Sequence, residues 1–262
     1  MTDLRHSFDG VPEIYDRVRP SYPPALFDDV FLYLDVSSRV SPKVVEIGPG
    51  TGQATAGLLE RGAQVTAVEI GPRMSAFLRR KFANEARLEV VTSAFEDAQL
   101  ASEVYDLVVS ATAFHWVDPD IRLVKARRLL RPGGGLAIIS TNRIASSADR
   151  GFFERAFPVY QKYRPDEQRH ELPGEDLTPP EHGELLVSGL FDDVTLRRYR
   201  WDQTYSTAGY ADLQRSYSWT QTVAPAAQET LIADLCDVIE REYGGSVVRP
   251  LVITLTLGRR PR

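Results

Sequence analysis

The sequence has little cysteine, no excess of positive charge and no long apolar run. Its single cysteine, Cys236, leaves no partner for an intrachain disulfide, which excludes a disulfide-stapled secreted domain and is typical of a reducing compartment. The formal net charge is −5 and the basic residues are scattered, so we expect no binding to nucleic acid. No apolar segment reaches the length of a bilayer-spanning helix, so we expect no membrane partner.

Signals for export, metal binding and serine-based catalysis are also missing. The first residues lack an apolar run behind a basic start, so we expect no signal peptide and a cytoplasmic location. The four histidines form no cluster with ligand spacing, so we expect no metal, and no Gly-x-Ser-x-Gly motif is present. Cys236 shares an apolar helical stripe with Leu231, Leu235 and Ile239, and we interpret it as a core residue.

Strand and helix patterns alternate regularly along most of the 262 residues. Short Val/Ile-rich runs predict strands, and the stretches between them have helical spacing with Gly or Pro at their ends. The expected strands are 43–47, 64–68, 88–91, 105–109 and 136–140, with 194–203 and 251–257 pairing at the sheet edge. This alternation predicts one doubly wound α/β domain, whose parallel sheet is covered by helices on both faces.

Two regions depart from the alternation. Residues 1–22 are polar and aromatic, and we expect a flexible arm there. Residues 142–187 are rich in charge, proline and aromatic residues, and we interpret them as helical and irregular lid material. We therefore divide the domain into a cofactor-binding core with its N-terminal arm, 1–141, and a lid region that includes the last two strands, 142–262.

The most informative stretch, 43–53, has the sequence KVVEIGPGTGQ. A short buried strand there leads into a glycine-rich turn and then a helix, which lets a ligand lie against backbone at a helix N-terminus. Glu69 ends the next predicted strand, 21 residues beyond Gly48, where an acid accepts hydrogen bonds from a ribose diol. Together these features predict a nucleoside-containing cofactor.

Two residues distinguish between candidate cofactors. The dinucleotide pattern Gly-x-Gly-x-x-Gly requires glycine where this chain has Gln53. Glu46, two residues before Gly48, would repel a pyrophosphate in a low-dielectric crevice. S-adenosylmethionine carries an ammonium group and a sulfonium and no phosphate, so it suits this carboxylate better. An NAD-type dinucleotide-binding oxidoreductase is the alternative.

Four motifs resemble those of class I S-adenosylmethionine-dependent methyltransferases, in the same order and at normal spacing. They are 45–52 (VEIGPGTG), 67–74 (AVEIGPRM), 106–111 (DLVVSA) and 129–136 (LLRPGGGL). Two further segments, 15–23 (YDRVRPSYP) and 113–118 (AFHWVD), are similar to the branch related to trans-aconitate methyltransferase. The resemblance spans residues 11–141. It implies S-adenosylmethionine as cofactor and a Rossmann-like, mostly parallel seven-stranded sheet with an antiparallel edge strand and a helical lid insert.

We expect the cofactor outside the carboxyl ends of the strands, at the switch point in strand order. The resemblance assigns the cofactor carboxylate to Tyr15 and Arg19, and we expect Ile70 and Met74 to form an apolar wall for adenine. The family often has an acid that reads the adenine amino group where this chain has Ala94. The full set of expected contacts is Tyr15, Arg19, Glu46, Gly48, Pro49, Gly50, Gly52, Glu69, Ile70, Met74, Ala94, Phe95, Glu96 and Ala111.

Methyl transfer from a sulfonium is an in-line displacement, so the protein must align the acceptor and, for a hydroxyl or amine, remove a proton. His115, after the fourth strand, is the candidate general base, although its ring could instead hold Trp116 over the cofactor. Arg143 could anchor an acidic substrate. We expect a small organic acceptor with a carboxylate, hydroxyl or amine. A non-catalytic S-adenosylmethionine-binding protein is a further alternative, and the oligomeric state stays open.

Overall fold

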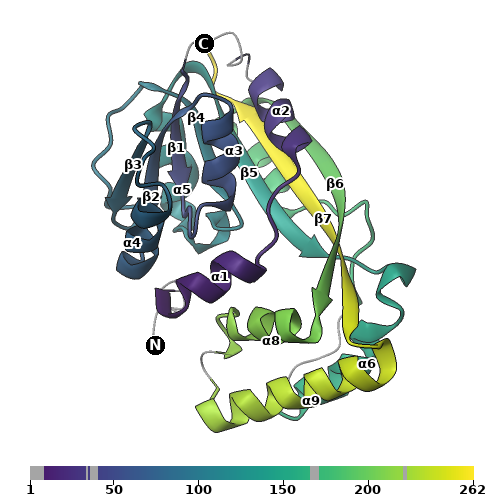
Figure 1. The fold of residues 1–262 in the computed structure, drawn as a ribbon. Helices are drawn as coiled ribbons and strands as arrows, with labels where there is room; N and C mark the ends of the chain where they lie inside the picture. Colours follow the sequence, from purple (N-terminus) through teal and green to yellow (C-terminus); the bar gives the residue numbers. More distant parts are fainter. Residues whose placement is uncertain (1–8, 34, 36–40, 166–170, 221–222) are drawn as a thin grey trace. The chain divides into compact units, whose positions relative to one another are not determined.

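A computed structural model describes residues 9–33, 35, 41–165, 171–220 and 223–262. Their strands form one seven-stranded sheet in the order β3-β2-β1-β4-β5-β7-β6 (Figure 1). The strands are β1 (Lys43–Ile47), β2 (Gln64–Glu69), β3 (Leu88–Thr92), β4 (Tyr105–Ala111), β5 (Leu130–Arg143), β6 (Asp192–Ser206) and β7 (Ser246–Arg259). The helices are α1 (Pro12–Val18), α2 (Pro24–Tyr33), α3 (Gln53–Glu60), α4 (Pro72–Lys81), α5 (Pro119–Leu129), α6 (Phe152–Gln161), α7 (Pro180–Ser188), α8 (Thr207–Arg215) and α9 (Pro225–Tyr243), with short 3-10 turns η2 (Phe114–Trp116) and η3 (Ser147–Asp149).

The chain forms two compact units. The sheet unit comprises 21–141, 178–199 and 253–262, and the helical unit comprises the described parts of 1–20, 142–177 and 200–252. β5, β6 and β7 each pass along the chain from one unit into the other, because the unit boundaries fall within these strands.

The parallel part of the sheet brings the carboxyl ends of β1, β2 and β4 to one edge. Ile47 at the end of β1 pairs with Val68 of β2 on one side and with Ser110 of β4 on the other. Strand order reverses at β1, since β2 and β3 extend to one side of it and β4 and β5 to the other. Open α/β sheets bind their ligands at such a switch point, outside the carboxyl ends of the strands.

Side chains alternate between the two faces along each strand of the sheet unit. Val45 and Ile47 face a core that includes Leu129 of α5. Glu46 lies between them in sequence, so it points to the opposite face, where its carboxylate meets Thr55 of α3. The alternation thus decides that the one acid of β1 is enclosed beneath α3.

β7 lies between β5 and the edge strand β6 and runs antiparallel to β5. The amide of Arg260 donates to Gly134 near the start of β5, and the amide of Ile144, just past β5, donates to Pro250 within β7. Figure 1 shows β6 and β7 pointing in opposite directions. The expected fold class, a doubly wound, mostly parallel seven-stranded sheet with antiparallel pairing at one edge, is confirmed.

An aromatic core fills the helical unit. Tyr210 of α8 is 1% exposed, and the ring of Phe152 from α6 meets it edge-on at a centroid distance of 5.2 Å. Leu235 and Ile239 of α9 belong to the same core. Cys236, expected in this core, is only half-buried beside it.

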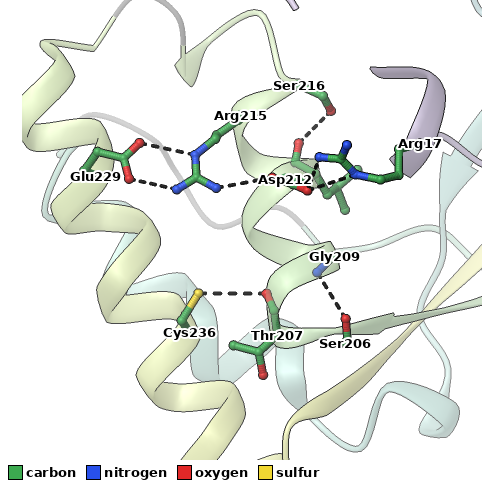
Figure 2. Close-up of polar contacts among 10 residues, drawn as sticks. Arg17, Ser206, Thr207, Gly209, Asp212, Arg215, Ser216, Glu229 and Cys236 are labelled. Atoms are coloured by element: carbon green, nitrogen blue, oxygen red, sulfur yellow. Dashed lines mark hydrogen bonds and ion pairs between the residues drawn. The ribbon is translucent and has the colours of Figure 1, made fainter. Parts of the chain in front are cut away.

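Ion pairs join α1, α8 and α9 within the helical unit (Figure 2). Asp212 of α8 accepts from Arg17 of α1 at 2.5 Å and from Arg215 at 3.3 Å. Arg215 also pairs with Glu229 of α9 at 2.8 Å. Because the partially exposed carboxylate of Asp212 contacts two guanidinium groups, the three helices share one charge network rather than isolated surface pairs.

We expected a flexible arm over residues 1–22, and this prediction is wrong for the second half, which forms α1. Residues 1–8 lie outside the described residues. Pro12 occupies the first turn of the helix, where its fixed φ suits helix entry. At the other end, the hydroxyl of Tyr205 donates to the carbonyl of Val18 at 3.0 Å. These partners are far away in sequence, so the short helix depends on packing that local patterns do not show.

We expect Gly57→Ala in α3 to destabilise the protein. A Cβ at Gly57 would lie 2.3 Å from the ring of Phe27 in α2. Overpacking of this kind costs about 1–3 kcal/mol, which exceeds the gain of about 1 kcal/mol in helix propensity. Urea unfolding should show a net loss of about 1 kcal/mol, and adding Phe27→Leu should restore part of it.

The matched control is Gly183→Ala in α7, where an added Cβ meets nothing within 4 Å. It should raise the free energy of unfolding by about 0.5–1 kcal/mol. Equal effects of the two substitutions would contradict the close packing of α2 on α3.

Candidate functional site

Glycines hold the loop after β1 in the left-handed region. Gly48, Gly50 and Gly52 have φ angles of 64°, 57° and 89°. Other residues adopt such angles only with strain. A Cβ on Gly48 would lie 2.5 Å from the Cβ of Ala113, and one on Gly52 would lie 2.6 Å from the ring of Phe82. The loop's own conformation and packing therefore require these glycines, in addition to any close approach of a ligand.

Glu69, at the end of β2, joins this loop to the start of α4. Its Oε2 accepts from the amide of Gly50 at 3.0 Å, and its Oε1 accepts from the amide of Gly71 at 2.9 Å. Gly71 is the N-cap residue of α4, and the Glu69 residue is 7% exposed. One buried carboxylate thus sets the spacing of two segments at the switch point; its contact with a ribose stays a prediction.

Glu46 is enclosed rather than open at this edge. It is 1% exposed, and its Oε2 accepts from the hydroxyl of Thr55 at 2.6 Å. Burial raises the pKa of Glu46 to about 7, opposed by the Thr55 hydrogen bond and reinforced by the nearby charge of Glu69. The carboxyl group is therefore poised between its neutral and charged forms near neutral pH.

The expected adenine wall lies around the start of α4. Met74 is 2% exposed, so its side chain is packed inside the unit, whereas Ile70 is half-buried. Pro49 is buried within the glycine loop, and its carbonyl accepts from the amide of Gly52 at 2.9 Å. A role of these residues toward adenine stays a prediction.

The loop after β3 is fastened to α5 by Lys125. Its ammonium group donates to the carbonyls of Glu96 and Ala98 at 2.9 and 2.8 Å and lies 5.2 Å from the centroid of the Phe95 ring. Phe95 is 4% exposed and belongs to the core. The Glu96 side chain accepts from a backbone amide at the start of α5 at 3.0 Å. The carbonyl of Ala94 accepts from the amides of Asp97 and Ala98 within this loop, and a role of the loop toward adenine stays a prediction.

Polar groups gather after the end of β4. Ala111 is half-buried, and Thr112, which follows it, has a φ of 57°, which is a strained conformation for a β-branched residue. The amide of Thr112 donates to Ile139 of β5 at 2.7 Å, and its Oγ1 lies 3.1 Å from the hydroxyl of Tyr22. Strain of this kind persists only where surrounding contacts hold it, and it is typical of functional sites.

His115 lies in the turn η2 after β4, where solvent reaches its ring. Its ring centroid is 4.9 Å from that of Trp116, at an interplanar angle of 43°. Loss of surrounding water lowers the pKa of His115, Glu181 opposes this shift, and Arg122 adds to it. The imidazole is therefore neutral at pH 7, which is the form that accepts a proton.

Tyr15 and Arg19 belong to the helical unit. The guanidinium of Arg19 stacks on the rings of Tyr15 and Tyr217, at 4.7 Å from each centroid, and donates to the carbonyl of Ser216 at 2.9 Å. Their predicted role toward the cofactor carboxylate is neither supported nor opposed by these contacts.

Three residues that hold the site were assigned no role from the sequence. Thr55, Lys125 and Tyr22 hold the site through contacts 9, 29 and 90 residues away along the chain. Only Thr55 had a usable signal, because a hydroxyl one turn into the helix after the glycine loop lies within reach of the strand end.

Within the described residues, no group of three or more His, Cys, Asp or Glu side chains could hold a metal ion. None of the described helices has both the length and the apolar character needed to cross a membrane.

Comparison with known proteins decides the family. The model of the methyltransferase domain family matches residues 45–138, which include the glycine loop and Glu69. An uncharacterized methyltransferase of Geobacillus kaustophilus is 31% identical over 175 residues, covering 60% of this chain and 79% of its own length. The chain belongs to the class I S-adenosylmethionine-dependent methyltransferases. S-adenosylmethionine is the cofactor of this family.

Two further comparisons show how much of each chain is matched and which fold is shared. An uncharacterized methyltransferase of Mycobacterium tuberculosis is 36% identical over 141 residues, which are 54% of each chain. The chain thus spans about half the length of the first curated relatives that it matches. Phosphoethanolamine N-methyltransferase 2 of Haemonchus contortus, solved with phosphomonomethylethanolamine and S-adenosylhomocysteine, superposes with a TM-score of 0.56 at 15% identity. That match covers 100% of this chain and 61% of the other, and it supports the fold.

The buried acid of this methyltransferase predicts a pH-dependent stability. The pKa of Glu46 is about 7 in the folded state against 4.5 for the free side chain. Folding therefore favours the protonated form of Glu46. The resulting contribution to the free energy of unfolding is complete below pH 4.5 and is lost as the pH rises through about 7. The loss is on the order of 3 kcal/mol.

Glu46→Gln keeps an oxygen for the Thr55 hydroxyl and has no charge to bury. Between pH 5 and pH 8, its free energy of unfolding in urea should rise relative to the wild type by up to about 3 kcal/mol. The exposed acid Glu60 at the end of α3 supplies the control, Glu60→Gln, which should leave the pH profile unchanged. Parallel profiles for wild type and Glu46→Gln would show that Glu46 ionises normally.

Proposed function

We propose that this chain transfers a methyl group from S-adenosylmethionine to a small organic acceptor with a carboxylate, hydroxyl or amine. The observation that carries the proposal is the Glu69 carboxylate, which lies at the switch point and binds the glycine loop and the start of α4 together. Family membership supports the cofactor. The Glu46 carboxyl group beneath the loop disfavours a pyrophosphate and so the alternative NAD-type oxidoreductase.

The sheet unit fits the cofactor at several points. A carboxylate at the end of the second strand of the sheet, as at Glu69, can accept hydrogen bonds from a ribose diol. We propose that the cofactor lies against the loop at Gly48 and Gly50 and that its adenine lies near Ala94 and Phe95. Glu46 can ionise to balance a cationic ligand. We propose that 1–141 carry the cofactor site and that 142–262 contribute to the acceptor site.

S-adenosylmethionine, when bound, supplies an electrophilic methyl group and an excellent leaving group. The chain's own residues then have to align the acceptor and exclude water, and for a hydroxyl or amine they also remove a proton. His115 is neutral at pH 7 and follows β4, so it is the candidate for that proton. A carboxylate acceptor would need no base.

Calorimetric titration with S-adenosylhomocysteine, with NAD as a second ligand, tests the cofactor. We expect micromolar binding of S-adenosylhomocysteine and none of NAD. Glu69→Ala should weaken binding by about 1–3 kcal/mol, because it removes a charged acceptor. The exposed Glu89 on the neighbouring strand β3 gives the control Glu89→Ala, which should bind normally. Normal binding by a folded Glu69→Ala would place the ribose elsewhere, and tight NAD binding would revive the oxidoreductase.

His115→Ala tests the proposed base. With hydroxyl or amine acceptors and methyl-labelled S-adenosylmethionine, kcat should fall by about 10²- to 10⁴-fold while affinity for S-adenosylhomocysteine is kept. Loss of cofactor affinity instead would indicate that the ring only holds Trp116 in place. Unchanged turnover in a folded variant removes His115 from catalysis.

A further inference from the structure

Helix α7 is fastened to the turn η2 by one arginine. Arg122 of α5 donates through Nη1 to the carbonyl of Phe114, the residue before His115, at 3.1 Å. Its Nε donates to Glu184 of α7 at 2.9 Å, and its Cζ lies 5.0 Å from the centroid of the Phe114 ring. All of these residues belong to the sheet unit. The turn that carries His115 and one face of α7 are therefore held together within a single unit.

Glu181 lies on the same face of α7. It is three residues before Glu184, and residues at this spacing are neighbours on a helix surface. Oε2 of Glu181 is buried, and among the residues that the structure describes it has no hydrogen-bond partner. A buried acceptor without a donor is costly, so each one in a folded protein calls for an explanation. The face of α7 that is fastened to η2 thus carries an unused carboxylate oxygen.

The charge of Glu181 acts on His115. Loss of surrounding water lowers the pKa of His115 most, Glu181 raises it, and Arg122 lowers it. Glu184 pairs with Arg122 and offsets part of that positive charge, whereas Glu96 accepts from a backbone amide at the start of α5. Glu181 lies in the first turn of α7, where the helix dipole favours an ionised carboxylate. An imidazolium at His115 would therefore be stabilised by Glu181.

We propose that Glu181 is a positioning residue for the general base, and that its unpartnered carboxylate oxygen stabilises the imidazolium that forms when His115 takes a proton from the acceptor. The inference rests on the proposed function, because it assigns a partner to the base of that reaction. A carboxylate beside an imidazole favours the charged form of the ring and so makes the ring a stronger base.

The proton transfer is balanced as follows in atoms and electrons. The O–H or N–H bond of the acceptor breaks, and its proton moves to a ring nitrogen of His115. The electron pair left on the acceptor forms the new bond to the methyl group, and the sulfur keeps the pair of the bond that breaks. The imidazolium then releases its proton to water, and the charge of Glu181 is unchanged throughout.

The first test is a histidine titration of the full chain followed by NMR. In Glu181→Gln the midpoint for His115 should move to lower pH by about 0.2 to 0.7, because the carboxylate that favours the imidazolium is lost. His115→Ala assigns the signal among the four histidines. Glu181→Asp keeps the charge and should restore most of the midpoint. This measurement needs neither acceptor nor cofactor, so it does not depend on methyltransferase activity.

Asp120→Asn is the matched control. Asp120 is an exposed acid in the first turn of α5, close to His115 in the sequence, and its removal should leave the His115 midpoint unchanged. An unchanged midpoint in folded Glu181→Gln would overturn the proposal. Equal shifts in Asp120→Asn and Glu181→Gln would also overturn it, because they would show a general effect of net charge.

Turnover with hydroxyl or amine acceptors gives the second test. Glu181→Gln should lower kcat by about 2- to 5-fold and keep KM, and Glu181→Asp should recover part of the loss. In the His115→Ala background Glu181→Gln should cause no further loss, because its effect passes through the imidazole. A separate, additive loss in that background would overturn the proposal. A shifted midpoint without methyl transfer by the wild type would uphold the pairing of Glu181 with His115 and refute the proposed function alone.

Discussion

Two backbone amides from different segments, those of Gly50 and Gly71, donate to the single carboxylate of Glu69 at the end of β2. Charge-assisted bonds of this kind are among the stronger ones in proteins. Here the bond from Gly71 is buried and the bond from Gly50 is partly buried. They fix the glycine loop relative to α4, and with it the start of α3. The negative charge that does this also raises the pKa of Glu46. The geometry and the electrostatics of the cofactor end of the sheet unit therefore depend on one side chain.

The site is held at a cost in stability. Glu46 has its carboxyl group enclosed between β1 and α3, and Thr112 has a backbone conformation that a β-branched residue seldom adopts. Both features lie at the carboxyl ends of β1 and β4, at the switch point of the sheet. A buried acid and a strained residue at this edge are what a binding site there would produce.

The arginines of the helical unit fall into two groups by the kind of side chain that they contact. Arg17 and Arg215 share Asp212 and so fasten α1 and α9 to α8. Arg143 and Arg249 have aromatic neighbours and no carboxylate within the described part of the chain. The first group therefore contributes to the arrangement of helices within this unit.

Local sequence determined the strand and helix order, the switch-point loop and the acid at Glu69, because alternating apolar patterns and glycine spacing are short-range properties. It also indicated the cofactor class through Glu46 and Gln53. Only the tertiary structure decided that Pro12–Val18 is a helix, since the hydroxyl that binds Val18 comes from Tyr205. It likewise decided that Glu46 is enclosed by Thr55 and that Arg122 binds Glu184, because burial and contacts between helices follow from packing between segments that local sequence patterns do not relate.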